Sequence, residues 1–115
     1  RSFHIGKTLA LMLTDKDCTV TVAHSKTKNL QDKIDNADII ITAIGKANYF
    51  NADNFKKGQI VIDVSINFDD NGKICGDISK KSYKDLDVKG VVYTEVPSGV
   101  GLMTTTSLME QIKNL

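Results

Sequence analysis

Residues 38–44 read Asp-Ile-Ile-Ile-Thr-Ala-Ile, and this run decides the fold class. An almost continuous apolar run of this length is typical of a strand in a parallel sheet, because such a strand is buried on both faces. Residues 60–64, Ile-Val-Ile-Asp-Val, form a second run of the same kind. Two such strands in one chain favour an α/β protein built on a parallel sheet.

Helical and strand patterns alternate along the rest of the chain. Apolar residues at helical spacing predict helices over residues 5–16 and 29–37. The β-branched residues 18–23 lie between these helices and predict a strand. The sequence further predicts a helical turn over 51–57, a tight turn at Asn71-Gly72, a helix over 79–86, a strand over 91–94 and a last helix over 104–115.

This alternation is the pattern of the Rossmann-like, doubly wound dinucleotide-binding fold. In that fold a first strand lies in the middle of the sheet and leads into the first helix, whereas this sequence opens with a loop that enters the helix. Without the first strand, its two neighbours would each have an unpaired edge. We therefore expect residues 1–115 to be one dinucleotide-binding Rossmann domain that lacks its first strand. A fragment of a longer protein, or a nicked protein that keeps its upstream piece, fits this expectation.

Composition and charge bound the partners and the compartment. Hydrophobic residues make up 41% of the chain, charged residues 25%, and the formal net charge is +1. This balance favours neither a nucleic acid nor a membrane as a partner, and no apolar run reaches the roughly 18 residues of a membrane span. Cys18 and Cys75 lack metal-ligand spacing, so no metal is expected. They fit two reduced thiols in a cytoplasmic protein, and a disulfide between them is the alternative.

The start of the first helix is a candidate phosphate site. Gly6 would let the backbone approach a pyrophosphate there, where unpaired N–H groups and the helix dipole favour an anion. A glycine in a simple turn is the alternative interpretation.

The segment after residue 23 bears on the choice of cofactor. NAD-binding Rossmann folds place a carboxylate there to bind the ribose 2′-hydroxyl, but residues 24–27 read His-Ser-Lys-Thr. Hydroxyls and cations would hold a 2′-phosphate instead, so Arg1 and Ser25, with His24 or Lys26, favour NADP. A solvated polar loop is the alternative.

Four further residues are candidates for a functional role because of their chemistry. Asp63 ends an apolar strand, where a carboxylate that caps a neighbouring loop is favoured over a general base. Tyr49 and Phe50 fit core or loop packing better than a cofactor pocket. His4 fits a surface position better than a catalytic one.

Seven stretches resemble, in order and spacing, motifs of the methylenetetrahydrofolate dehydrogenase/cyclohydrolase family. The most specific is Val-Pro-Ser-Gly-Val-Gly-Leu-Met-Thr at 96–104, where Ser98 replaces a glycine of the family pattern. Ser65 replaces another such glycine. The other stretches are residues 1–7, 24–27, 37–39, 43–46, 61–67 and 72–77.

The resemblance implies site residues and an activity. It implies NADP contacts at Arg1, Ser2 and Ser25, Ile66 beside the nicotinamide end with Thr104 near it, and Pro97 and Ser98 facing the folate. The family oxidises methylenetetrahydrofolate by hydride transfer to NADP, and then hydrolyses the methenyl product in the same cleft. Its catalytic side chains lie in an N-terminal half, so no catalytic residue is expected in this chain, and residues 1–115 alone should be inactive. The full-length protein is expected to be a homodimer.

Two other functions share parts of the pattern. An NADP-dependent dehydrogenase of the shikimate-dehydrogenase type shares the run around residues 37–45 but lacks the segment at 96–104. A non-enzymatic nucleotide sensor would need only the Rossmann pattern. A sensor would bind the nucleotide without ever reducing it.

Overall fold

The structure, a computed structural model, describes residues 2–24 and 26–96, without the side chains of residues 2–6. Two helices precede the strands in this part of the chain, and a third helix lies before the last strand. The elements are α1 (Ser2–Asp15), α2 (Leu30–Asp35), β1 (Ile39–Thr42), β2 (Ile60–Asp63), β3 (Asn67–Phe68), β4 (Ile74–Cys75), α3 (Tyr83–Lys89) and β5 (Val92–Tyr93), with short 3-10 helices at Ala52–Asn54 and Lys80–Ser82. The helix predicted over 104–115 lies outside the described residues.

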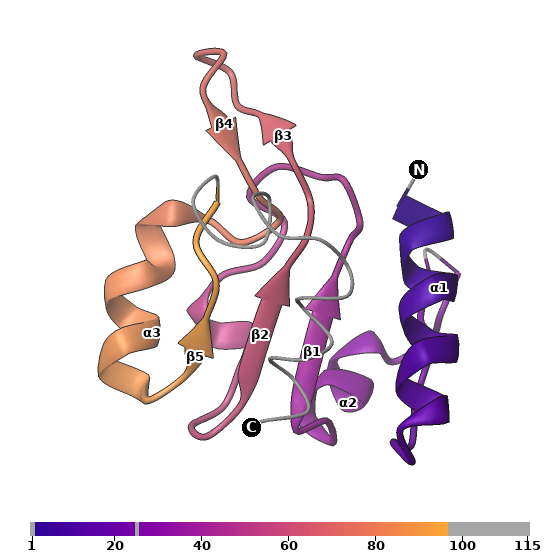
Figure 1. The fold of residues 1–115 in the computed structure, drawn as a ribbon. Helices are drawn as coiled ribbons and strands as arrows, with labels where there is room; N and C mark the ends of the chain where they lie inside the picture. The colour runs from indigo at the N-terminus through magenta and orange to yellow at the C-terminus, as the bar shows by residue number, and fades with distance from the viewer. Residues whose placement is uncertain (1, 25, 97–115) are drawn as a thin grey trace.

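A parallel sheet of three strands, in the order β1-β2-β5, forms the centre of the molecule (Figure 1). The β1–β2 register pairs Ile39 with Ile60 and Thr42 with Asp63, so the two strands end at the same edge. β5 joins through the pairing of Ile60 with Val92. The predicted α/β class with a parallel, Rossmann-like sheet is confirmed.

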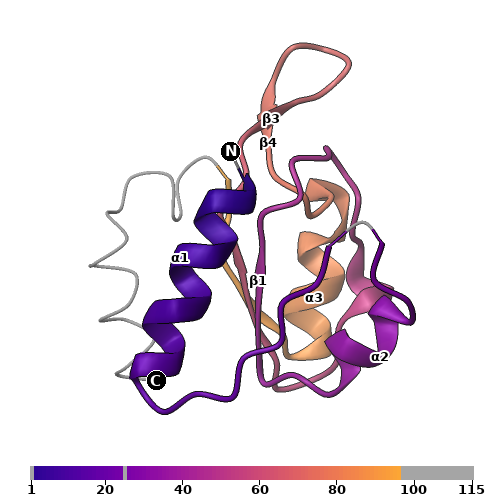
Figure 2. The ribbon, with the colours of Figure 1, turned by 90° about the vertical axis from the view of Figure 1, so that its right-hand side faces the viewer.

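Helices cover both faces of this sheet, with α1 on one side of β1 and α2 and α3 on the other (Figure 2). Neighbouring residues of β2 supply the two contacts, because successive side chains of a strand point to opposite faces. Val61 packs with Ile34 of α2 and Leu86 of α3. Ile62 packs with Leu9 of α1. Burial of each such side chain contributes roughly 1.5–3 kcal/mol, so β2 holds the three layers together.

The prediction of a strand over residues 18–23 is wrong for this structure, which has no strand there. These residues lack a neighbouring strand, and a strand forms only where its backbone N–H and C=O groups pair with those of another strand. In the described part of the chain β1 pairs with β2 alone, and residues 18–23 pair with no strand. The first strand of the Rossmann pattern would pair with both.

The start of α1 also differs from the sequence expectation. The helix begins at Ser2 rather than at residue 5, so His4 and Gly6 belong to the helix and not to a loop before it. Residues 2–5 contain neither proline nor glycine, and nothing in them interrupts a helix. The first turn of α1 therefore begins close to Arg1.

A small antiparallel hairpin, β3 and β4, projects from the sheet beyond the end of β2 (Figure 1). Its turn is the predicted Asn71-Gly72 turn, in which Gly72 has a φ of 76° that other residues rarely adopt. The Asp69 carboxylate accepts bonds from Asn71 N at 2.8 Å and Lys73 N at 2.9 Å.

Within residues 2–24 and 26–96, no helix has the length and apolarity that a membrane span needs.

Candidate cofactor site at the carboxyl edge of the sheet

The carboxyl ends of the strands and the N-terminus of α1 lie at the same end of the molecule (Figure 1). In open α/β sheets, ligands bind outside the carboxyl ends of the strands. The loop after β1, residues 43–48, and the loop after β2, residues 64–66, lie at this edge and contact each other, since Gly45 N donates to Ser65 Oγ at 3.3 Å. These loops form the described part of the candidate site.

Asp77, which follows β4, connects the two loops through its buried carboxylate. Oδ2 accepts bonds from Thr42 Oγ1 at 2.7 Å, Ile44 N at 2.8 Å and Ser65 Oγ at 2.8 Å. Oδ1 accepts bonds from Gly45 N at 3.1 Å, Lys46 N at 3.1 Å and Asn67 Nδ2 at 3.2 Å. One side chain from the hairpin therefore fixes the ends of both neighbouring strands.

The loop after β1 is an anion-binding nest that the protein fills itself. Three successive backbone N–H groups, those of residues 44–46, point to the Asp77 carboxylate. Such groups bind phosphate in many nucleotide sites when they are free. Here they are occupied, so this loop offers no phosphate site through them. The N-terminus of α1 remains the candidate for that role.

Asp63, the last residue of β2, caps neighbouring backbone rather than facing solvent. Its Oδ1 accepts from Ser65 N at 3.1 Å and its Oδ2 from Ile78 N at 3.0 Å. Burial raises the pKa of this carboxyl from 3.8 to about 6, and the charge of Asp77 adds to the rise. The predicted structural role of Asp63 is confirmed.

Gly76 lies directly against Asp63. A Cβ on Gly76 would approach the carboxyl carbon of Asp63 to 2.7 Å and Val96 Cγ2 to 2.8 Å, so only glycine fits there. This close approach brings residues 76–78 across the end of β2. It also places the Asp77 side chain among the loops described above.

Among the site residues that the family resemblance implies, Ile66 is the one whose side chain the structure describes. It is 58% exposed, at the carboxyl edge, and both of its neighbours, Ser65 and Asn67, bond to Asp77. Ser2 begins α1, and its side chain is not described. The other predicted positions lie outside the described residues; they are Arg1, Ser25, Pro97, Ser98 and Thr104.

His24, Lys26 and Thr27 of the His-Ser-Lys-Thr segment are joined by hydrogen bonds to one another. Thr27 N donates to His24 O at 2.9 Å, and His24 N donates to Thr27 Oγ1 at 2.8 Å. The backbone N–H of Lys26 donates to His24 Nδ1 at 3.1 Å, so this imidazole nitrogen is a hydrogen-bond acceptor within the segment. The sequence contains no Asp or Glu between Asp17 and Asp32, and the side chain of Lys26 is exposed. No carboxylate within this stretch of sequence would therefore repel an anion bound beside His24 and Lys26.

Tyr49 and Phe50 have the packing role that the sequence favours. Phe50 is buried in the core, and the Tyr49 ring meets it edge-on with 4.9 Å between centroids. Lys46 Nζ lies over the Tyr49 ring, 5.6 Å from its centroid. Neither aromatic ring belongs to the loops around Ile66.

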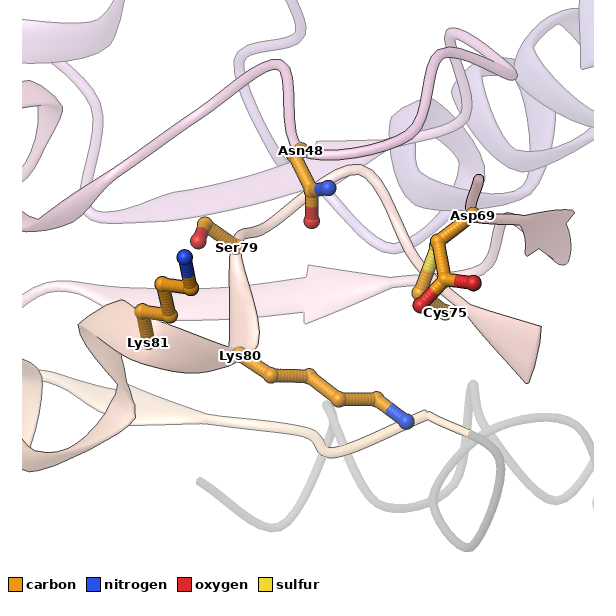
Figure 3. A pocket seen from close by; sticks show the side chains of 6 residues that line it. All are labelled: Asn48, Asp69, Cys75, Ser79, Lys80 and Lys81. Atoms are coloured by element: carbon orange, nitrogen blue, oxygen red, sulfur yellow. The ribbon is translucent and has the colours of Figure 1, made fainter. Parts of the chain in front are cut away.

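A shallow pocket of about 290 Å³ lies at the base of the hairpin (Figure 3). Its lining contains none of the predicted site residues and comprises Asn48, Asp69, Cys75, Ser79, Lys80 and Lys81. Lys80 Nζ donates to Ile74 O at 2.7 Å, which holds that ammonium on the hairpin.

Cys75 is buried, Cys18 is exposed, and both are free thiols. In the described part of the chain, no three His, Cys, Asp or Glu side chains are grouped so that they could hold a metal ion.

Comparison with known proteins decides the family. The family model described as "Tetrahydrofolate dehydrogenase/cyclohydrolase, NAD(P)-binding domain" matches residues 1–115. The chain belongs to this family. Its parallel sheet and its filled nest after β1 are therefore parts of an NAD(P)-binding domain.

Relatives of the family extend beyond the present chain. The bifunctional protein FolD of Methanoculleus marisnigri is 46% identical over 110 residues, which are 96% of this chain and 38% of that protein. The methylenetetrahydrofolate dehydrogenase/cyclohydrolase structure from Thermoplasma acidophilum has a TM-score of 0.77 and 36% identity, and the match covers 93% of this chain and 38% of that one. The FolD structure from Campylobacter jejuni has a TM-score of 0.76 and 42% identity, with 91% and 36% covered. The chain thus spans less than two fifths of the length of these relatives.

Asp77 lies in the stretch 72–77 that resembles a family motif, but the sequence did not predict a role for it. The sequence does contain one indication of a structural role: Asp77 is the single acid in the otherwise apolar stretch Ile74-Cys75-Gly76-Asp77-Ile78. A carboxylate in such a stretch is buried, and a buried carboxylate needs several donors. The pattern does not reveal which donors these are.

Proposed function

We propose that residues 1–115 are the NADP-binding part of a bifunctional methylenetetrahydrofolate dehydrogenase/cyclohydrolase. The observation that carries the proposal is the match of the family model over the whole chain. The parallel sheet, the exposed Ile66 at its carboxyl edge and the position of the α1 N-terminus at the same end support it. The match over 96–104 favours this function over a shikimate-type dehydrogenase.

The preference for NADP over NAD rests on charge. The turn at residues 24–27 has no carboxylate near it in the sequence, and it presents the exposed Lys26. A doubly charged 2′-phosphate would gain charge-assisted bonds there, whereas a ribose 2′-hydroxyl would find no acidic partner. Arg1 and Ser25 are proposed as the direct contacts of this phosphate.

The remaining residues position the two substrates. Ser2, in the first turn of α1, is proposed to bind the cofactor where the helix dipole favours phosphate. Ile66 would pack beside the nicotinamide end with Thr104 near it, and Pro97 and Ser98 would face the folate. Bound NADP supplies the chemistry of the oxidation, since it accepts the hydride. The residues of this chain orient the cofactor and keep water away from it.

The whole protein is proposed to be cytoplasmic and homodimeric, with a folate as its small-molecule substrate. The side chains that activate the folate are proposed to lie in a preceding domain, which would account for the share of the relatives that this chain leaves uncovered. Residues 1–115 alone are therefore expected to show no turnover.

An activity assay tests the proposal directly. The full-length protein, mixed with methylenetetrahydrofolate and NADP, should form reduced nicotinamide and then formyltetrahydrofolate, and shikimate in place of the folate should give no reduction. Binding of NADP without reduction of it in the presence of the folate would contradict the proposal and would favour a nucleotide sensor.

A further inference from the structure

Asp77 is the most heavily bonded side chain that the structure describes at the carboxyl edge, and the function proposed above gives it no role. An ionised carboxylate has about four lone-pair positions on two oxygens. Asp77 receives six donors within 3.2 Å, and its residue is 0% exposed. It has no acceptor capacity left for a ligand, and it has no surface with which to touch one.

The donors of Asp77 come from both sides of the candidate site. The backbone of residues 44–46 forms one side. Ser65 and Asn67, which flank the exposed Ile66, form the other. The position of Ile66 relative to the loop after β1 is therefore set through a single carboxylate.

The backbone around Asp77 is in turn anchored to the core. Phe50 N donates to Asp77 O at 2.8 Å, and Phe50 is buried. Ile78 N donates to the Asp63 carboxylate at the end of β2. Asp77 thus connects a rigid part of the fold to two loops that have no regular structure of their own.

We propose that Asp77 is a positioning residue for hydride transfer: it holds Ile66 and the loop after β1 where the nicotinamide end of the cofactor requires them. The inference rests on the proposed function. A displacement of only about 1 Å at a reacting centre can lower a rate by as much as a hundredfold. Loss of the carboxylate should therefore impair the step that uses the nicotinamide more than a step that does not.

The two activities proposed for the full-length protein separate these effects. Asp77→Asn keeps the size of the side chain but turns one acceptor oxygen into an NH2 group that faces other donors. We expect the dehydrogenase kcat/KM for NADP to fall by about tenfold or more, while the cyclohydrolase kcat/KM, which needs no hydride transfer, stays within about twofold.

The matched control is Asp69→Asn in the hairpin turn. The Asp69 carboxylate also accepts two backbone bonds, from Asn71 and Lys73, but it bonds to neither loop of the site. Both activities of this variant should stay within about twofold of the wild type.

An equal fall of both activities in Asp77→Asn, or no fall in either, would overturn the proposal. If Asp77→Asn does not fold, Asn67→Ala decides, because it removes one donor beside Ile66 and should lower only the dehydrogenase activity, by about threefold. A wild-type protein without dehydrogenase activity would refute the proposed function instead, so the two failures are distinguishable.

Discussion

Asp63 and Asp77 are both removed from solvent, with 1% and 0% of their surface exposed, but they are held differently. Asp77 accepts six hydrogen bonds, two of them from side-chain hydroxyls and one from a side-chain amide. Asp63 accepts from backbone N–H groups alone, those of Ser65 and Ile78 and also that of Asp77. These bonds lower the pKa of Asp63, but burial outweighs them and raises it to about 6.

This raised pKa predicts how stability depends on pH. The folded protein binds a proton at Asp63 near pH 6, whereas the unfolded chain binds it only near pH 3.8. The free energy of unfolding contributed by this group is therefore largest below pH 3.8 and declines as the pH rises through 6. Urea unfolding of the full-length protein at a series of pH values should show this contribution as a difference between the wild type and Asp63→Asn.

The matched control for this measurement is Asp69, whose pKa shift has the opposite sign. Backbone bonds, chiefly from Lys73, lower the pKa of Asp69. The Asp69 contribution is therefore present above its ordinary pKa and is lost as the pH falls, so Asp69→Asn should change the profile only in the acid range. A wild-type profile parallel to that of Asp63→Asn between pH 4 and 6 would contradict the assignment to Asp63.

At the scale of elements, the junction between α2 and β2 depends on one buried side chain, Gln59. Its Nε2 donates to Ile34 O at 2.8 Å and Ala37 O at 2.9 Å, and its Oε1 accepts from Lys56 N at 2.8 Å. It thereby binds one carbonyl in the last turn of α2 and one just beyond the helix, where carbonyls lack the regular partners of a helix. Gln59 is only 3% exposed, so water cannot easily take its place.

Gln59→Ala should lower the free energy of unfolding by about 2–4 kcal/mol, because Ala37 O and Lys56 N lose the Gln59 side chain as a partner and Ile34 O loses one of its two donors. The control is Gln31→Ala on α2. Gln31 also makes three bonds, to Asp35 and Asn54, but it is exposed. This control should cost about 1 kcal/mol or less. Equal losses in the two variants, measured by urea unfolding, would refute the argument from burial.

The elements also show what a sequence pattern can and cannot predict. The apolar runs at residues 38–44 and 60–64 predict strands of a parallel sheet, because such runs are stable only where helices cover both faces of the sheet. Residues 18–23 have equally suitable side chains but form no strand, since strand formation also needs a neighbouring backbone. The turn at Asn71-Gly72 needed no distant partner and was predicted correctly. The sequence pattern therefore predicted a turn or strand correctly where its hydrogen-bonding partner is a nearby residue or another strand described in this chain.

At the scale of the whole molecule, two apolar cores lie on opposite faces of one sheet. The sequence predicted this layered class, because alternating helices and strands allow few other arrangements. It did not predict the role of Asp77, because none of its six donors is closer than ten positions along the chain. The site residues implied by the family resemblance mostly lie outside the described residues, so they remain predictions.

The central claim is that this domain selects NADP because the turn after residue 23 offers cations and hydroxyls and no carboxylate. The most direct measurement is calorimetric titration of the full-length protein with NADP and with NAD, for the wild type and for Ser25→Asp. The account predicts that the wild type binds NADP at least about tenfold more tightly, and that the new carboxylate abolishes this preference. Tighter binding of NAD by the wild type, or an unchanged NADP preference in Ser25→Asp, would contradict it.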